Sequence, residues 1–206
     1  MTIQAVVFDI GNVLIEWHPE KFYDGLIGAE RRKALFAEVD LDGMNLSVDL
    51  GAPFKKTVMA KADEHPEWRD EIVTWHDRWI DMCSPEIPHS IRLLRALRSK
   101  GVPVFALSNF GTDTFEFAST RYPVLHEFDR PYISGYLEMI KPDAAFYQHL
   151  EDDSGLSGDA LLFADDRPDN IDAALARGWK AHLFEHPQGW ADRLVAEGLL
   201  TEAEAA

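Results

Sequence analysis

Short, uninterrupted apolar runs punctuate the chain, and between them apolar residues recur every three or four positions. Runs of the first kind are typical of strands buried on both faces, as in a parallel sheet. They lie at 6–8, 102–107 and 161–164, with a weaker run at 132–133, and a last strand is predicted at 180–184. The segments between them have the helical period. Strands that alternate with helices predict an α/β, Rossmann-like fold, in which a parallel sheet is covered on both faces by helices.

Residues 18–84 differ from this pattern, because they show helical periodicity and no strand-like alternation. The clearest stripe belongs to a helix predicted to begin at Pro66, in which the apolar positions are Trp68, Ile72, Trp75 and Trp79. Such a stripe indicates the core of a small helical bundle, and an aromatic ligand surface is the alternative. We therefore predict a helical cap domain at 18–84, inserted into a core domain formed by 1–17 and 85–206.

Charge and composition narrow the classes of partner. The 206 residues are 46% hydrophobic and carry a formal net charge of −16, which disfavours nucleic acid and anionic membranes as partners. The single cysteine, Cys83, excludes an internal disulfide and fits a reducing compartment. Neither a secretory leader pattern nor a run of about 18 apolar residues is found. These features predict a cytoplasmic location; no feature predicts an oligomeric state.

Polar residues follow the predicted strands at the points where each strand ends. Asp9 comes after the strand at 6–8, Ser108 after that at 102–107, and Asp165 and Asp166 after that at 161–164, while Lys141 precedes a helix. The carboxyl ends of parallel strands meet at one edge of a sheet, so we expect these side chains to lie together. Asp9 alone could be a turn-forming residue, a nucleophile or a metal ligand.

Together these residues match the needs of phosphoryl transfer to a carboxylate. Asp9 can attack in line. Carboxylate and carbonyl oxygens suit Mg²⁺, and Asp9, Asp166 and the Gly11 carbonyl could supply them. Ser108, nearby backbone amides and Lys141 can stabilise the charge that spreads over the transferred oxygens.

Four short motifs occur in a fixed order: FDIGNV at 8–13, LSN at 107–109, KP at 141–142 and FADD at 163–166. In these motifs the chain resembles the haloacid dehalogenase superfamily. The stretches 141–147 and 165–170 look particularly like the branch that includes glucose-1-phosphate phosphatases. The helical insertion falls between the first and second motifs, where members with a helical cap carry it. The resemblance implies a Rossmann-like core with a helical cap.

The resemblance also implies roles for individual residues. Asp9 is expected to be the catalytic nucleophile that becomes an aspartyl-phosphate. Ser108 and Asn109 are expected to bind the phosphate group. Lys141 is expected to act in catalysis and in substrate binding, since it would neutralise both Asp9 and the phosphate.

The expected cofactor is Mg²⁺, with Asp9, Asp166 and the Gly11 carbonyl as ligands and Asp165 in a supporting role. One position departs from the usual phosphatase pattern, which has a second aspartate, the general acid/base, where this chain has Gly11. The glucose-1-phosphate phosphatase-like branch tends to have glycine there as well. The proton donor is therefore not identified, and His18 and Glu16 are the first candidates.

The leading hypothesis is a Mg²⁺-dependent phosphatase that acts on a small phosphorylated metabolite, with sugar phosphates as one class. A 2-haloacid dehalogenase is the first alternative, because it uses the same aspartate without a metal. Two adjacent carboxylates at 165–166 favour a cation, since without one they would repel each other. A catalytically weak phosphate-binding or receiver-like protein is the second alternative, but receivers place their acidic pair at the first strand.

Overall fold

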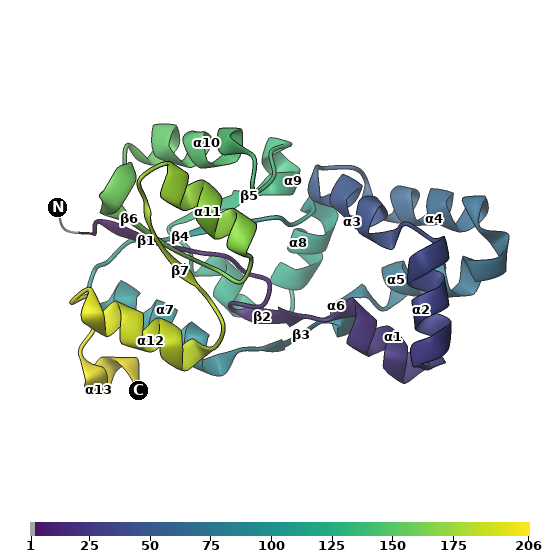
Figure 1. The fold of residues 1–206 in the computed structure, drawn as a ribbon, viewed down its shortest axis with the longest axis horizontal. Helices are drawn as coiled ribbons and strands as arrows, with labels where there is room; N and C mark the ends of the chain where they lie inside the picture. The colour runs from purple at the N-terminus through teal and green to yellow at the C-terminus, as the bar shows by residue number, and fades with distance from the viewer. Residues whose placement is uncertain (1–2) are drawn as a thin grey trace.

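A five-stranded parallel sheet forms the centre of the computed structural model, which describes residues 3–206 (Figure 1). The strand order is β5-β4-β1-β6-β7, and every neighbouring pair is parallel. The strands are β1 (Ala5–Phe8), β4 (Val104–Ser108), β5 (Arg130–Ile133), β6 (Leu161–Asp165) and β7 (Lys180–Leu183). The predicted α/β, Rossmann-like fold is confirmed.

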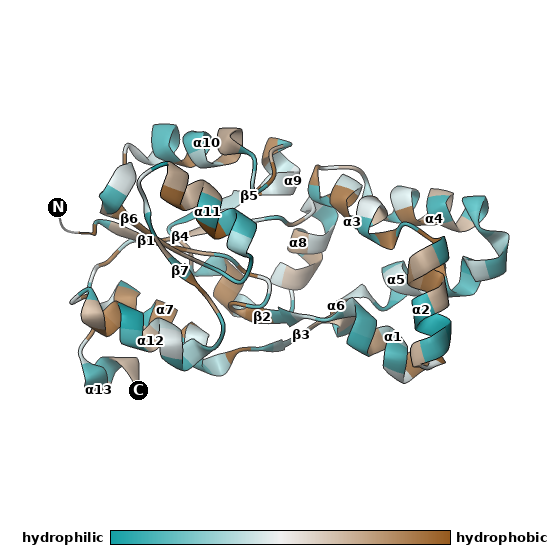
Figure 2. Ribbon diagram, in the orientation of Figure 1, coloured by the Kyte–Doolittle hydropathy of each residue, from teal (hydrophilic) through white to brown (hydrophobic). Residues whose placement is uncertain are grey.

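Helices cover both faces of this sheet. Successive residues of a strand point to opposite faces, so Phe8 packs in one core cluster and Val7 in the other. The Phe8 cluster includes residues of α7 (Pro88–Ser99), α8 (Thr112–Ser119) and α12 (Pro187–Ala196). The Val7 cluster includes residues of α10 (Ala144–Ser154) and α11 (Pro168–Ala176). The apolar strands lie between helices whose outer faces are more polar (Figure 2), as burial of a parallel sheet requires.

The helices α1 to α6 lie beyond the end of the sheet that is farther from the N-terminus of the chain (Figure 1). They are α1 (Pro19–Ile27), α2 (Ala29–Glu38), α3 (Leu41–Asp49), α4 (Phe54–Glu64), α5 (Arg69–Asp77) and α6 (Trp79–Met82). The predicted stripe residues Trp68, Ile72, Trp75 and Trp79 are all buried. The prediction of one helix from Pro66 was wrong, because a 3-10 turn (Pro66–Trp68) precedes α5, and α5 ends before Trp79. None of the described helices is long and apolar enough to cross a membrane.

A small antiparallel pair of strands, β2 (Ile15–Trp17) and β3 (Cys83–Glu86), joins the helical segment to the sheet. The sequence did not indicate it, because three or four residues are too short for a detectable alternation. The boundaries predicted between 17 and 18 and between 84 and 85 fall at this pair. The division into a core domain and a cap domain stays a prediction.

The remaining short elements connect these layers. They are 3-10 turns at Pro123–His126 and Gly158–Ala160, α9 (Ser134–Leu137) and α13 (Glu202–Ala205). Of these, α9 matters for the site, because Ser134 Oγ accepts a hydrogen bond of 2.8 Å from the Phe110 backbone N–H. This contact holds the loop after β4 in place.

A methyl group at Gly135 tests how tightly α9 packs against that loop. A Cβ there would lie 2.4 Å from Thr112 N and 2.8 Å from Gly111 C. We expect Gly135→Ala to lower the free energy of unfolding in urea by about 1–3 kcal/mol, because backbone atoms must move. The matched control is Gly25→Ala in α1, where nothing lies within 4 Å. It should be neutral or slightly stabilising; equal effects of the two substitutions would contradict this packing.

Candidate active site

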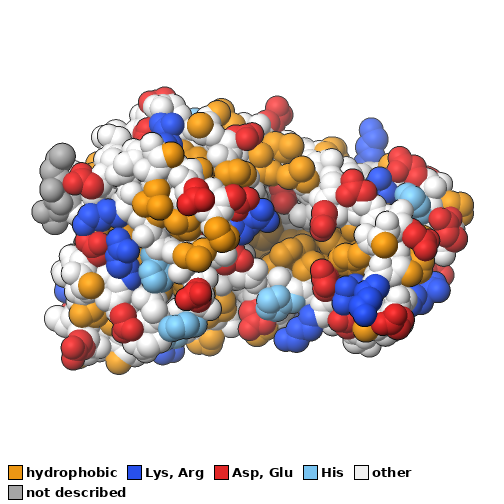
Figure 3. Space-filling model, in the orientation of Figure 1, with side chains coloured by type: hydrophobic (Ala, Val, Ile, Leu, Met, Phe, Trp, Pro, Cys, Tyr) orange, Lys and Arg blue, Asp and Glu red, His pale blue; other side chains and the backbone are white. Residues whose placement is uncertain are grey.

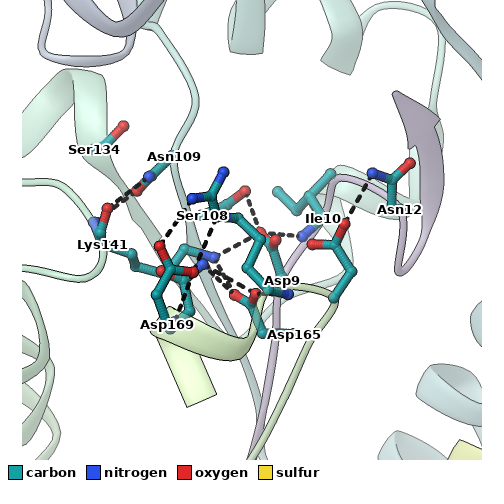
Figure 4. A network of polar contacts seen from close by, with 12 residues as sticks. Asp9, Ile10, Asn12, Ser108, Asn109, Ser134, Lys141, Asp165 and Asp169 are labelled. Carbon is teal, nitrogen blue, oxygen red and sulfur yellow. Dashed lines mark hydrogen bonds and ion pairs between the residues drawn. The ribbon is translucent and has the colours of Figure 1, made fainter. Parts of the chain in front are cut away.

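Three neighbouring strands deliver polar side chains to one point. Asp9 directly follows the central strand β1, Ser108 ends β4 on one side of it, and Asp165 ends β6 on the other. Lys141, in the loop before α10, reaches the same point (Figure 4). The structure therefore brings together the residues that the sequence predicted to meet at this edge of the sheet.

The two carboxylate oxygens of Asp9 have different surroundings. Asp9 Oδ1 accepts hydrogen bonds from the Ile10 backbone N–H (2.7 Å) and Ser108 Oγ (2.7 Å), and Lys141 Nζ lies 2.9 Å away. Asp9 Oδ2 has no hydrogen-bond partner within residues 3–206, and Asp9 lines a cavity. One oxygen thus fixes the carboxylate, and the other is left for a ligand.

Lys141 is fully enclosed between two carboxylates. Its Nζ lies 2.9 Å from Asp9 Oδ1 and 2.6 Å from Asp165 Oδ2, and its side chain is 1% exposed. The Asn109 side chain holds the Lys141 backbone from both sides: Oδ1 accepts from its N–H (2.8 Å) and Nδ2 donates to its carbonyl (3.0 Å). Asn109 therefore positions the lysine through its side chain, which leaves its backbone for the predicted contact with phosphate.

Burial and charge oppose each other in this cluster. Burial raises the pKa of Asp9 to about 6, although Lys141 and the Ser108 hydroxyl act against the shift. Burial alone would lower the pKa of Lys141, but Asp165 and Asp9 outweigh it and raise that pKa above its usual value. Lys141 is therefore a fixed positive charge beside the carboxylate of Asp9.

The adjacent residues Asp165 and Asp166 face different partners. Both Asp165 oxygens are used: Oδ1 accepts from the Arg167 backbone N–H (2.8 Å), Oδ2 faces Lys141, and Asn170 Nδ2 contacts both (3.0 and 3.1 Å). Asp166 accepts one side-chain hydrogen bond, from Asn12 Nδ2 (2.9 Å). This difference suits Asp165 to support and Asp166 to ligate.

Oxygen ligands for a hard cation gather at the same place. Carboxylate oxygens of Asp9, Asp165 and Asp166 lie within 4.8 Å of one another. Three carboxylates face one ammonium group, so the cluster has two uncompensated negative charges, which a divalent cation would balance. Within residues 3–206, no hydrogen bond uses the Gly11 carbonyl. These residues fit the oxygen ligands that Mg²⁺ requires.

A cavity of about 540 Å³ opens above this cluster, within the size range of small-molecule sites. Figure 3 shows a hollow with hydrophobic side chains gathered around it, between the sheet-bearing part and the six-helix part. Its polar floor includes Asp9, Ser108, Lys141 and Asp166, and α3 contributes Asp42, Asn45, Leu46 and Asp49. Its aromatic wall consists of Trp17, Trp75, Trp79 and Phe110. The cavity therefore joins a charged cluster to a wall suited to an organic group.

Comparison with known proteins identifies the family. The family model described as haloacid dehalogenase-like hydrolase matches residues 3–178. The chain belongs to the haloacid dehalogenase-like hydrolases. The resemblance inferred from the four motifs is thereby confirmed.

Individual relatives agree with this assignment. A sesquiterpene phosphatase, astK, from Aspergillus oryzae is 25% identical over 183 residues, which cover 86% of this chain and 87% of that one. A family enzyme from Bacteroides thetaiotaomicron has a TM-score of 0.76 at 21% identity, covering 94% of this chain and 99% of that chain. An L-2-haloacid dehalogenase from Xanthobacter autotrophicus has a TM-score of 0.60 at 17% identity, covering 99% and 87%. At these identities the structural likenesses establish the fold.

Two residues that contact the predicted site of this haloacid dehalogenase-like hydrolase were not predicted from the sequence. Asn12 has a left-handed backbone (φ 54°) that turns its amide toward Asp166, while its Oδ1 accepts from the Trp17 N–H (2.8 Å). Asn170 lies in the first turn of α11 and contacts Asp165. The motifs contain both residues, but a sequence does not show which backbone angle or helix face aims an amide.

The candidates for the missing proton donor are placed elsewhere. His18 Nε2 lies 3.3 Å from Glu16 Oε2, and neither residue lines the cavity above Asp9. His18 borders a separate surface depression with Trp17 and Lys21. The structure thus does not place His18 or Glu16 in the lining of the cavity above Asp9.

Proposed function

We propose that this haloacid dehalogenase-like hydrolase is a Mg²⁺-dependent phosphatase that hydrolyses a small phosphorylated metabolite through an aspartyl-phosphate on Asp9. The single observation that carries the proposal is the asymmetry of Asp9. Its Oδ1 is held by three donors while Oδ2 is open to the cavity. A carboxylate held in this way is a preorganised nucleophile.

The surrounding groups match the charge of a phosphate ester. Lys141 lies beside Asp9, and Ser108 Oγ can turn from Asp9 to a phosphate oxygen. The backbone N–H of Asn109 donates no hydrogen bond within residues 3–206. Fixed donors of this kind stabilise charge on the transferred oxygens.

The metal role follows from the donor set. Asp9, Asp166 and the Gly11 carbonyl would hold Mg²⁺, and Asp165 would support them through Lys141 and Asn170. When bound, Mg²⁺ would lower the repulsion between the phosphate dianion and the carboxylates. In support, the Bacteroides thetaiotaomicron relative has been crystallised in complex with magnesium and inorganic phosphate.

Two classes of phosphate ester fit this site. The glucose-1-phosphate phosphatase-like motifs favour a sugar phosphate, whereas the sesquiterpene phosphatase relative and the aromatic wall favour a more apolar ester. Both are small phosphate monoesters and both fit a cavity of about 540 Å³.

A haloacid dehalogenase is the main alternative, since structural neighbours include an L-2-haloacid dehalogenase. The dehalogenase reaction needs no cation. In this chain, however, Asp9, Asp165 and Asp166 lie together, and only the ammonium group of Lys141 pairs with Asp9 and Asp165 among the described residues. The acidic cluster therefore favours the phosphatase. The receiver-like alternative is disfavoured because receivers place their acidic pair at the first strand. It is also disfavoured because this chain belongs to a hydrolase family.

A phosphate-release assay tests the proposal. The purified chain is assayed against sugar phosphates, isoprenoid monophosphates and 2-haloacids, each with Mg²⁺ and with excess chelator. We expect phosphate release from at least one ester class only with Mg²⁺, and no halide release. Halide release in chelator would overturn the proposal in favour of the dehalogenase.

Asp166→Ala should remove most of the metal-dependent activity. The substitution deletes a carboxylate ligand of Mg²⁺ and leaves Asn12 Nδ2 without its acceptor. We expect turnover at fixed Mg²⁺ to fall by about 10–100-fold or more, with partial recovery at high Mg²⁺. Calorimetric titration with Mg²⁺ measures the loss of binding directly. Asp172→Asn, an exposed position on α11, is the control and should bind Mg²⁺ as the wild type does.

A further inference from the structure

The proposed phosphatase needs a proton donor that the usual position does not provide. The alcohol that leaves a phosphate ester is strongly basic, and general acid catalysis is typically worth about 10²–10⁴-fold. Gly11 has no side chain to donate a proton, although its backbone is not left-handed and an added Cβ would meet nothing closer than 4.0 Å. Neither steric crowding nor backbone conformation therefore requires glycine at position 11. This suggests that another residue donates the proton.

Helix α3 contributes Asp49 to the lining of the same cavity. The end of α3 is fixed to the core at two points. Ser134 Oγ donates to the Asp49 backbone carbonyl (2.6 Å). Val48 lies against Gly111, where an added Cβ would meet Val48 Cγ1 at 2.5 Å. Asp49 is thus held beside the loop that follows Ser108.

The side chain of Asp49 is also oriented. Asn45 Nδ2, one turn earlier on α3, donates to Asp49 Oδ2 (2.9 Å). Within residues 3–206, no cationic side chain pairs with Asp49. A partly buried carboxyl group that lines the cavity and has no cationic partner can exchange its proton with a ligand.

Two effects favour the protonated form. Asp49 is the last residue of α3, where the negative end of the helix dipole disfavours an anion. Burial raises the pKa of Asp49 to about 7; the Gly111 backbone N–H opposes the shift and the Asp9 charge adds to it. A carboxyl that titrates near neutral pH can donate a proton and take it back.

The other acidic groups that line the cavity have a different role or are unsuitable as proton donors. Asp9 is the nucleophile, and Asp166 faces the metal position. Asp42 lies in the first turn of α3 and is exposed to solvent. Burial raises the pKa of the Cys83 thiol to about 12, so it holds its proton too firmly.

We propose that Asp49 is the general acid/base of the reaction, an inference that rests on the proposed phosphatase activity. In the first step Asp9 attacks phosphorus, the bond from phosphorus to the leaving oxygen breaks, and the Asp49 carboxyl gives its proton to that oxygen. In the second step a water attacks the phosphorus of the aspartyl-phosphate. The Asp49 carboxylate takes a proton from the water, inorganic phosphate leaves, and Asp9 is restored.

Asp49→Asn tests this role with a series of phosphate esters in Mg²⁺. The wild type should show a shallow dependence of kcat/KM on the leaving group. In the variant, kcat/KM for a simple alkyl phosphate should fall by about 10²–10⁴-fold. For dinitrophenyl phosphate, whose leaving group needs no proton, kcat/KM should stay near the wild-type value while kcat falls, because the second step has lost its base. That retained kcat/KM also shows that the variant is folded.

Asp70→Asn is the matched control, because it removes one exposed carboxylate from the first turn of α5, outside the cavity. It should keep the wild-type dependence on the leaving group. An equal loss on all esters in Asp49→Asn, or no loss on alkyl phosphates, would overturn the role of Asp49. Failure of the proposed function is a different result: the wild type would release no phosphate from any ester.

Discussion

Asp9→Asn should abolish phosphate release while the fold persists. An amide is a poor nucleophile, and removal of a nucleophile has cost other enzymes on the order of 10⁶-fold in kcat. The asparagine keeps an oxygen that can accept from the Ile10 N–H and Ser108 Oγ. It also removes one of three crowded carboxylates. We therefore expect wild-type or higher resistance to urea together with the loss of turnover.

The control for Asp9→Asn is Asp172→Asn, the same chemical change at an exposed position of α11. It should retain both turnover and stability. Turnover of Asp9→Asn within a small factor of the wild type would mean that another group attacks the substrate. Loss of the folded state would mean that Asp9 is structural.

Lys141→Met should damage both stability and activity. The ammonium lies between Asp9 Oδ1 (2.9 Å) and Asp165 Oδ2 (2.6 Å), and all three side chains are at least nine-tenths buried. Removal of one partner from a buried ionic group leaves uncompensated charge and typically costs about 3–5 kcal/mol. We expect the free energy of unfolding in urea to fall by about this amount and phosphate release to be almost lost.

Lys56→Met, at an exposed position of α4, provides the comparison for the lost ammonium. Surface substitutions of this kind usually change stability by less than about 0.5 kcal/mol. Equal stability of Lys141→Met and Lys56→Met would show that the lysine does not hold the cluster together. Full activity of Lys141→Met would remove it from the reaction.

The sequence identified the parts of the fold that depend on local pattern. Apolar runs at 6–8 and 161–164 are β1 and β6, and the polar residues that follow them meet because neighbouring parallel strands end at one edge. The pair β2 and β3 was missed, since it is shorter than the periodicity that reveals a strand. The predicted helix from Pro66 was wrong because apolar spacing continues across the break after Asp77, where no glycine or proline marks the end.

Some residues of the candidate site could likewise be predicted from the sequence, and others could not. Asp9, Ser108, Lys141, Asp165 and Asp166 stand at strand ends or in the loop that leads to α10, so order along the chain predicted their meeting. Asp49 could not be predicted, because it is far from the motifs in sequence and its place depends on how α3 packs against α9 and Gly111. Long-range packing of a helix onto a loop leaves no periodic trace in the sequence.

The most direct test of the central claim is the identity of the residue that carries phosphate during turnover. The Mg²⁺-loaded wild type is mixed with a radiolabelled phosphate ester, quenched rapidly in acid, reduced with borohydride and digested for mass spectrometry. An aspartyl-phosphate on Asp9 predicts label on the acid-quenched protein, release of that label on reduction, and homoserine in place of aspartate at position 9. Label on Ser108, or turnover of the ester with no reducible aspartate at position 9, would contradict the account.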